Sequence, residues 1–175
     1  MGLQLIFAVE ADKKSKSDWI YMKDTIDYFY QYDHVQFKFS PVYMNGRGKY
    51  KNKEKEILKL ISQYASTSKN NRSKVIYCFD CDDYDIKQED ADFLSEVRQY
   101  CKEKDYEFVW FCKDVECAYL GKKVDAGQKS KEAGKFKAKK LIRNVNPDRL
   151  SVNTYRINTS NVMIILDRYL TRKNF

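Results

Sequence analysis

The chain is poor in proline and histidine and has no long apolar run. Its two prolines, Pro41 and Pro147, leave room for long uninterrupted helices. No stretch approaches the roughly 18 apolar residues of a membrane span, and the short apolar run at 5–9 has no basic flank before it, as a signal peptide would. We therefore expect a cytoplasmic protein with no membrane partner. The single histidine, His34, argues against histidine-based catalysis.

The five cysteines are an odd set in a chain without an export signal, so we expect free thiols. Cys78 and Cys81 have CxxC spacing, and Cys112 and Cys117 could complete a zinc site with them. Cys78 and Cys112 lie inside apolar runs, however, where cysteine usually behaves as a small hydrophobic residue. The pattern therefore favours buried thiols over zinc.

A hydrophobic fraction of 43% and an aromatic fraction of 15% indicate a globular chain, and 175 residues suit one core. Ser17 is a candidate N-cap for the first helix. The spacing of Ile57, Leu58, Ile61 and Tyr64 predicts that these four side chains of the second helix face the core. Apolar periodicity predicts strands at 4–9, 35–39, 75–79 and 108–111, and helices at 17–32, 53–64, 88–103, 115–120 and 160–170.

This alternation of strands and helices defines the expected fold class. Strands that are apolar on both faces and separated by amphipathic helices are typical of parallel α/β proteins. We predict an open, mainly parallel four-stranded sheet with helices on both faces, of the Rossmann-like kind. The α/β core should span residues 1–120. Residues 121–175 should form a basic segment and a C-terminal helix packed on the same domain.

The net charge of +8 is concentrated in that basic segment. Residues 121–149 hold ten Lys or Arg and three Asp or Glu, a local excess of +7. Such an excess is expected where a surface meets a polyanion such as DNA or RNA. An alternative is a solvated helix or a mobile loop with no ligand. The candidate phosphate contacts, which surround the aromatic Phe136, are Lys135, Lys137, Lys139, Lys140 and Arg143.

Acidic residues follow two of the predicted strands. Glu10 ends the first strand, and Asp80, Asp82, Asp83 and Asp85 follow the third. Ligands of open parallel sheets bind beyond the carboxyl ends of the strands. If the two strands are neighbours, these carboxylates converge and repel, so that some stay protonated or a cation lies among them. Oxygen ligands of this kind suit Mg²⁺ or Mn²⁺. The alternative is a solvated acidic turn that caps the next helix.

Other aspartate motifs fit this pattern less well. An EF-hand loop would need a glycine in place of Asp85 and an acid in place of Ala91. A haloacid-dehalogenase phosphatase would carry its nucleophilic aspartate after the first strand. A response-regulator receiver would have paired acids after the first strand, which Glu10 and Asp12 match only loosely.

A glutamate ending the first strand and a DxD ending the third resemble the Toprim domain of topoisomerases, bacterial primases and related nucleases. Here these residues are Glu10, Asp80 and Asp82, and the resemblance covers residues 3–112. The order of the later segments resembles RloB-like proteins, small Toprim relatives found at abortive-infection and restriction loci. This chain departs from the family at Ala11, where a glycine is usual.

The resemblance implies that Asp80 and Asp82 bind Mg²⁺, and that Glu10 is a further ligand or a general acid/base. Asp83 and Asp85 would then be candidates for a second ion, and Glu116 for an additional acid after the fourth strand.

Three functions follow from these observations. The first is a metal-dependent nuclease acting on DNA or RNA, with a role in phage defence implied by the family resemblance alone. The second is a nucleic-acid-binding module that has lost catalysis. The third is a phosphoryl- or nucleotidyl-transfer enzyme acting on a small nucleotide, although the chain has no phosphate loop of the usual spacing. Toprim domains are often joined to ATPases, so the resemblance also implies a protein partner of that kind.

Overall fold

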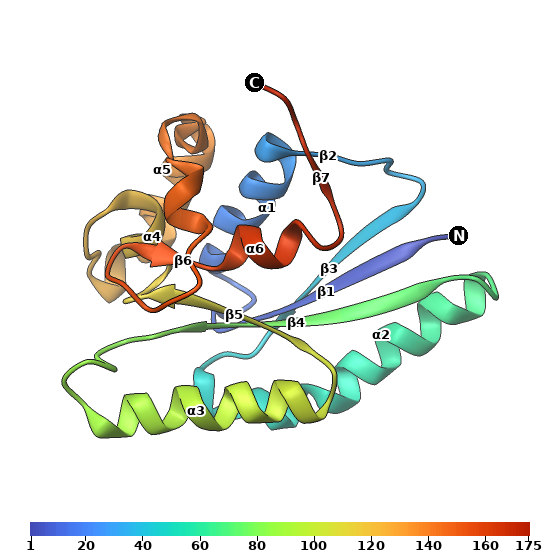
Figure 1. Ribbon diagram of the computed structural model, residues 1–175, viewed down its shortest axis with the longest axis horizontal. Coiled ribbons are helices and arrows are strands. Elements are labelled where there is room, and N and C mark those ends of the chain that lie inside the picture. The colour runs from blue at the N-terminus through green and yellow to red at the C-terminus, as the bar shows by residue number, and fades with distance from the viewer.

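A computed structural model describes residues 1–175 and contains a central five-stranded sheet (Figure 1). Four strands are parallel, and the short β6 pairs antiparallel with β5. The predicted α/β class with a mainly parallel sheet is confirmed, except that four strands were expected. In spatial order the strands are β3 (Phe37–Tyr43), β1 (Leu3–Val9), β4 (Arg72–Asp80), β5 (Glu107–Cys112) and β6 (Thr159–Ser160).

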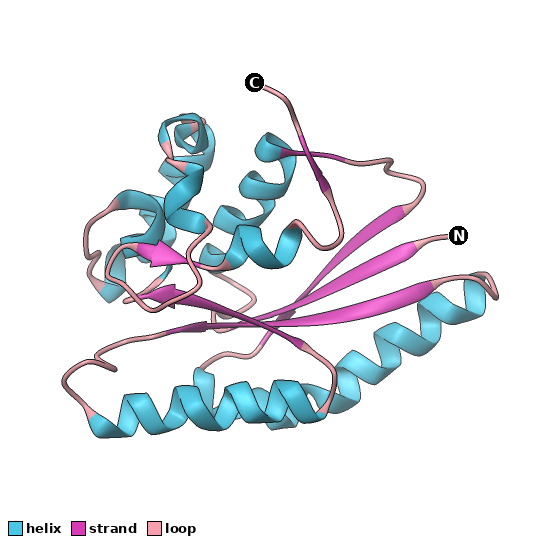
Figure 2. Ribbon diagram, in the orientation of Figure 1, coloured by secondary structure: helices cyan, strands magenta, loops and turns pink.

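Helices cover both faces of this sheet (Figure 2). One face carries α2 (Glu54–Thr67) and α3 (Gln88–Glu103), and the other carries α1 (Ser17–Phe29), α4 (Val115–Leu120), α5 (Lys129–Ala138) and α6 (Val162–Leu166). The remaining elements are the small antiparallel pair β2 (Tyr30–Gln31) and β7 (Thr171–Arg172), and the 3₁₀ helices η1 (Arg47–Lys53), η2 (Ala126–Gln128), η3 (Leu141–Asn144) and η4 (Pro147–Leu150).

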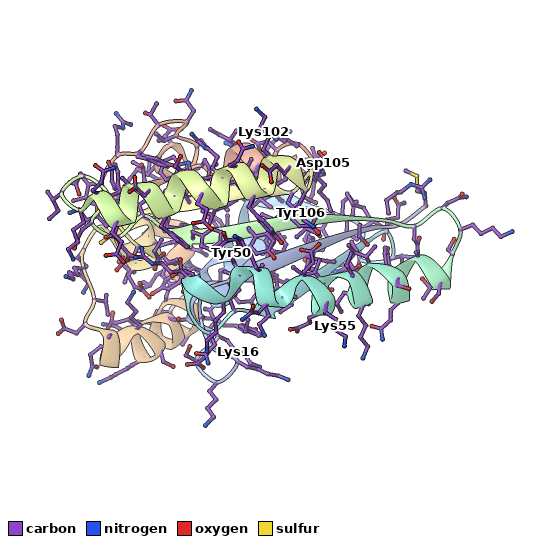
Figure 3. The ribbon with its side chains drawn as sticks, turned by 90° about the horizontal axis from the view of Figure 1, so that it is seen from below. Lys16, Tyr50, Lys55, Lys102, Asp105 and Tyr106 are labelled. Atoms are coloured by element: carbon purple, nitrogen blue, oxygen red, sulfur yellow. The ribbon has the colours of Figure 1, made fainter.

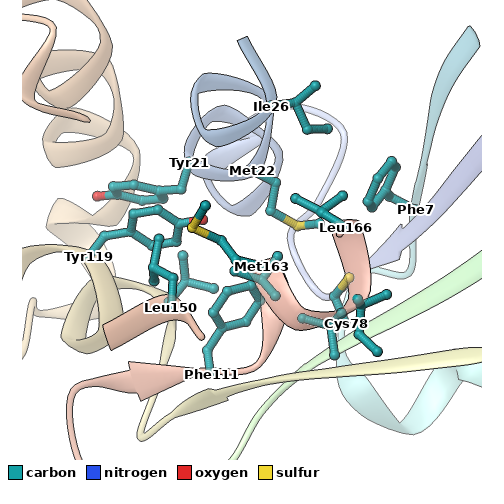
Figure 4. Close-up of a cluster of buried hydrophobic side chains, with 14 of the residues drawn as sticks. Phe7, Tyr21, Met22, Ile26, Cys78, Phe111, Tyr119, Leu150, Met163 and Leu166 are labelled. Carbon is teal, nitrogen blue, oxygen red and sulfur yellow. The ribbon is translucent and has the colours of Figure 1, made fainter. Parts of the chain in front are cut away.

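The alternation of side chains along β1 feeds two hydrophobic cores. Leu5 and Phe7 pack on the side of α1, whereas Ile6 and Ala8 pack on the side of α2 and α3. Figure 4 shows the first core, in which Phe7 lies with Met22 of α1 and Leu166 of α6. All of these side chains are buried. A strand that is buried on both faces explains the unbroken apolar run at the start of the sequence.

The basic segment is part of the first core. Phe136 of α5 is buried and lies 4.8 Å from the ring of Tyr21 and 5.9 Å from that of Tyr119. Ala133, one turn earlier, is also buried. The middle of the segment is therefore a packed helix, α5, and Phe136 cannot stack on a nucleic-acid base while it is buried.

Several local predictions need correction. Ser17 is the first residue of α1 and not its cap, because Lys16 precedes it in the left-handed conformation (φ 51°). Leu58 points outward with 52% of its surface exposed, and Ile57 is the only fully buried residue of α2. The last helix is only Val162–Leu166, shorter than periodicity predicted. In contrast, the bounds predicted for α3 and α4 are confirmed.

The outer edge of β3 carries a proline. Leu3 N donates to Gln36 O at 2.7 Å, and Met44 N donates to Val9 O at 2.8 Å. In a parallel pair, main-chain groups alternate in direction, so the nitrogen of Pro41 points away from the sheet. Its missing N–H therefore removes no bond to β1, which is where sheets tolerate proline.

None of the helices has both the length and the apolar character needed to cross a bilayer. All five cysteines are buried and unpaired, which confirms the prediction of free thiols. No group of three or more His, Cys, Asp or Glu side chains is arranged to hold a metal, so the cysteines do not form a zinc site in this conformation.

Candidate active site

The acidic ends of two strands meet because β1 and β4 are neighbours. Their parallel register pairs Ala8 with Tyr77 and brings both carboxyl ends to one edge of the sheet. Just beyond the paired residues, Asp80 N donates a hydrogen bond to Glu10 Oε1 at 3.0 Å. The juxtaposition of Glu10 and Asp80 that the sequence predicted is therefore present.

A third carboxylate, from Asp18, lies in the same pocket. This pocket, which we call the acidic pocket, has a volume of about 320 Å³, and its charged lining includes Glu10, Asp18, Asp80 and Lys129. Asp18 belongs to the first turn of α1 and is 92% buried. Its Oδ2 accepts a hydrogen bond from Ala11 N at 2.9 Å, which fixes the turn after β1.

Crowding and burial favour the protonated forms of these acids. Burial, reinforced by the charge of Asp18, raises the pKa of Glu10 to about 8. Burial also raises the pKa of Asp18 to about 6, although the hydrogen bond from Ala11 opposes this shift. The pKa of Asp80 is raised well above its usual value by burial and by the charges of Glu10 and Asp18. Carboxylates this close together are tolerated only when protons or cations neutralise them.

Lys129, the first residue of α5, is the cation of the acidic pocket. Its Nζ lies 2.9 Å from Glu116 Oε2 and 3.3 Å from Asp114 Oδ2. Burial opposes its charge, but Asp80 and Glu116 outweigh that effect and raise the pKa of Lys129. The basic segment therefore supplies charge to the acidic residues directly.

Glu116 is fully buried, and neither of its carboxylate oxygens has a hydrogen bond of normal geometry. The ion pair with Lys129 is its one polar contact. Asp114 is better satisfied, because its Oδ1 accepts from Cys117 N at 2.8 Å and caps α4. Glu116 is thus the polar side chain near the pocket with the greatest need for a further partner.

Asp82 lies outside the acidic pocket and pairs with a cation. Its Oδ2 accepts from Arg47 at 2.9 Å, and the same guanidinium reaches Asp90 Oδ1 at 2.7 Å. Burial raises the pKa of Asp82, and Arg47 partly offsets that rise. A left-handed backbone at Asp82 (φ 49°) turns the chain here. The two aspartates of the DxD motif therefore face different surroundings.

Asp83 and Asp85 are also held by lysines. Lys113 Nζ lies 3.4 Å from Asp83 and 3.2 Å from Asp85, and Lys87 lies 2.8 Å from Asp83. Neither acid lines the acidic pocket with Glu10. The five predicted ligands are thus not gathered in one place in this conformation.

The donor chemistry of the acidic pocket fits a divalent cation, since Glu10, Asp18 and Asp80 offer only carboxylate oxygens. The carboxylate oxygens of Glu116, which pair only with Lys129, have the same character. No group of three acids is preformed as a ligand set, however, and Lys129 and Arg47 already neutralise part of the charge. Asp80 and Asp18 would hold a cation first, with Glu10 beside it, and Asp82 would join them only after release from Arg47.

Sequence reasoning gave no role at the site to Asp18, Arg47, Asp90, Asp114 or Lys129. Asp18 follows Ser17 at the start of a helix, where an acid is an ordinary complement to the helix dipole. Arg47 lies in a glycine-containing loop that gave no sign of a salt bridge to residues 35 and 43 positions later. Asp114 carried the one usable signal, as an N-cap residue placed between Cys112 and Glu116.

The predicted phosphate contacts lie on the exposed surface of α5, the turn after it and η3. All five side chains are exposed. Lys135 lies 3.9 Å from Glu132. The other four side chains make no ion pair; these are Lys137, Lys139, Lys140 and Arg143.

No protein-family model, curated protein or solved structure matches this chain. The resemblance to Toprim and RloB-like proteins therefore stays a prediction.

Proposed function

We propose that the protein is a metal-dependent nuclease that hydrolyses phosphodiester bonds at the acidic pocket. The observation that carries the proposal is the contact between Asp80 N and Glu10 Oε1, which joins the acidic ends of two adjacent parallel strands. In such sheets this edge is the usual place for ligands. Mg²⁺ or Mn²⁺ bound there would polarise the phosphate and lower the pKa of a water molecule.

Glu10 is the best candidate for proton transfer. Its Oε1 is occupied by the N–H of Asp80, so a proton would reside on Oε2. With a pKa of about 8 before any cation binds, this group is poised near neutral pH, as general acid/base catalysis requires. Asp80 and Asp18 would bind the divalent cation and so orient the phosphate. The exposed lysines of α5 would hold the nucleic-acid backbone.

The test is cleavage of labelled single- and double-stranded DNA and RNA with Mg²⁺ or Mn²⁺. Wild-type protein is compared with Asp80→Asn, Glu10→Gln and the matched control Glu89→Gln, which changes an exposed acid of α3. We expect metal-dependent cleavage by the wild type and the control, and a loss of 100-fold or more in the two site variants, about the size of a general acid/base effect. Equal cleavage by all four proteins would contradict the proposal.

A second candidate is a nucleic-acid-binding module without catalysis. It is favoured by the two salt bridges of Arg47, which hold Asp82 away from the acidic pocket, and by Lys129, which supplies a resident positive charge. In that case the wild type binds nucleic acid but cleaves none of the substrates with either metal. Binding measured by fluorescence anisotropy alongside cleavage separates the two candidates.

A further inference from the structure

A second charged pocket lies at the amino-terminal ends of the parallel strands, opposite to the carboxyl ends that border the acidic pocket. It has a volume of about 390 Å³ and is bounded by α3, α6 and the starts of β4 and β5. Glu107 opens β5 at this end, whereas Cys112 closes the strand near the acidic residues. Figure 3 shows Lys102, Asp105 and Tyr106 together at the end of α3. We call this the β5-entry pocket.

The charges of the β5-entry pocket do not cancel. It is lined by four basic and two acidic side chains. Lys74 pairs with Asp105 at 2.8 Å, and Arg168 pairs with Glu107 at 2.7 Å. The remaining two cations, Arg98 and Lys102, have no carboxylate partner. They lie four residues apart on α3, so they share one face of the helix.

Arg98 is an exposed side chain that lies against two aromatic rings. Its guanidinium carbon lies 5.6 Å from the ring centroid of Phe108 and 5.6 Å from that of Tyr155. None of its N–H groups donates a hydrogen bond within the protein. The position of Lys102 in the last turn of a helix is explained by the helix dipole. The dipole does not explain Arg98, whose guanidinium contacts two rings and keeps all of its donors free. Such cation–π contacts restrict the side chain and leave the guanidinium free for planar, bidentate recognition of an oxyanion.

We propose that the β5-entry pocket binds a phosphate monoester, such as the terminal phosphate of a nucleotide. Two unpaired cations match the two negative charges of a monoester better than the single charge of a diester. Arg98 would bind two phosphate oxygens, and Lys102 would contact the third. A volume of about 390 Å³ is in the range of small-ligand sites, and the ring of Tyr106 lines the same pocket.

The experiment is isothermal titration calorimetry of the full chain with AMP, with adenosine and with inorganic phosphate, in EDTA. EDTA keeps the acidic pocket free of divalent cations, so the result does not depend on nuclease activity. The variants are Arg98→Met and Lys102→Met, which keep the apolar stems, and the matched control Lys59→Met on the exposed face of α2. We expect saturable binding of AMP, no binding of adenosine, and a loss of roughly tenfold or more in each pocket variant but not in the control.

Two sources of the phosphate monoester can be distinguished by a second titration. A 5′-phosphorylated oligonucleotide is compared with the same strand ending in a 5′-hydroxyl. Preference for the phosphorylated strand that is lost in Arg98→Met would identify a nucleic-acid end as the ligand, whereas tight AMP binding without that preference would identify a free nucleotide. Absence of any phosphate-dependent binding at millimolar AMP, or binding that Arg98→Met and Lys102→Met leave unchanged, would overturn the proposal. Thermal melts of each variant verify that it is folded.

Discussion

The main-chain N–H of Asp80 donates to the carboxylate of Glu10 at 3.0 Å, although 70 residues separate them in the sequence. The hydrogen bond is a direct consequence of the parallel pairing of β1 with β4. It fixes the orientation of Glu10 while leaving one carboxylate oxygen free for a proton or a cation.

The stability of the protein should fall as pH rises from about 4 to 8 without divalent cations. In the folded state the pKa of Asp18 is raised from 3.8 to about 6, and that of Glu10 from 4.5 to about 8. Between these values the folded state holds protons that the unfolded chain has released. Each such group lowers the free energy of unfolding by about 1.4 kcal/mol per pH unit. Urea unfolding at several pH values measures this slope.

Glu10→Gln is the matched variant, because glutamine keeps the hydrogen-bond acceptor for Asp80 and cannot ionise. We expect a shallower slope between pH 6 and 8, where Glu10 titrates. Millimolar Mg²⁺ should flatten the wild-type slope by favouring the ionised acids, and should raise the melting temperature by mass action. A wild-type stability that stays constant or increases over this pH range would contradict the charge balance described for the acidic pocket.

Lys129→Met should destabilise the protein because it leaves Glu116 buried without a counter-charge. Glu116 is fully buried, and Lys129 is its one polar partner. An unpaired buried charged group costs about 1–3 kcal/mol or more. The control is Lys131→Met, an exposed residue of the same helix without an ion pair. Chemical denaturation of both variants at pH 8 measures the difference.

The single variant Glu116→Gln and the double variant Lys129→Met/Glu116→Gln complete a double-mutant cycle with Lys129→Met. Since the glutamine carries no charge, the double variant should recover part of the stability that Lys129→Met loses. Strict additivity of the two single changes would mean that the ion pair contributes nothing.

Phe136→Ala should loosen the whole basic segment. Phe136 is 99% buried between aromatic rings of α1 and α4. Removing such a side chain costs about 3–5 kcal/mol, whereas Lys137→Ala at an exposed position should stay within about 0.5 kcal/mol of the wild type. Limited trypsin digestion reads out the same change, since the lysines of α5 become cleavable when the helix detaches. Unchanged protection in Phe136→Ala would contradict the anchoring role.

The exposed cations of α5 and η3 should set the salt dependence of nucleic-acid binding. Each phosphate contact contributes about 0.9 to the slope of log affinity against log salt for duplex DNA. Replacing Lys137, Lys140 and Arg143 by Gln should therefore reduce the slope by roughly 2 to 3. The control replaces three exposed lysines on the other side of the sheet, Lys55 and Lys59 of α2 and Lys69 in the turn after it. An equal loss in both sets would indicate only the effect of net charge.

The sequence predicted those parts of the fold that depend on local pattern. The bounds of α3 follow from Leu94 and Val97, which are spaced for one buried face. The adjacency of Glu10 and Asp80 followed from the rule that parallel strands share a carboxyl edge. The short β6 was missed, because two residues carry no periodicity.

The remaining features of the site depend on contacts between segments far apart in the chain. Nothing near Arg47 indicates that it pairs with Asp82 and Asp90. Likewise, the lysine-rich pattern around Lys129 does not distinguish the one lysine that turns inward from those that face solvent. Leu58 was placed inward because its spacing from Ile61 fits a buried stripe, but α2 contacts the sheet along a narrower line.

The outward-facing nitrogen of Pro41 has a consequence for self-association. An exposed border strand is a template on which another chain can polymerise through its main chain. Pro41 offers no N–H donor on the outer side of β3, so a strand that paired there would lose a main-chain hydrogen bond in the middle of β3. At the other border, β6 occupies only the end of β5, opposite Phe111 and Cys112. Beside β6, the side chain of Asn161 accepts from Trp110 N and donates to Phe108 O, both at 2.9 Å, so the exposed main chain of β5 offers an incoming strand few free partners.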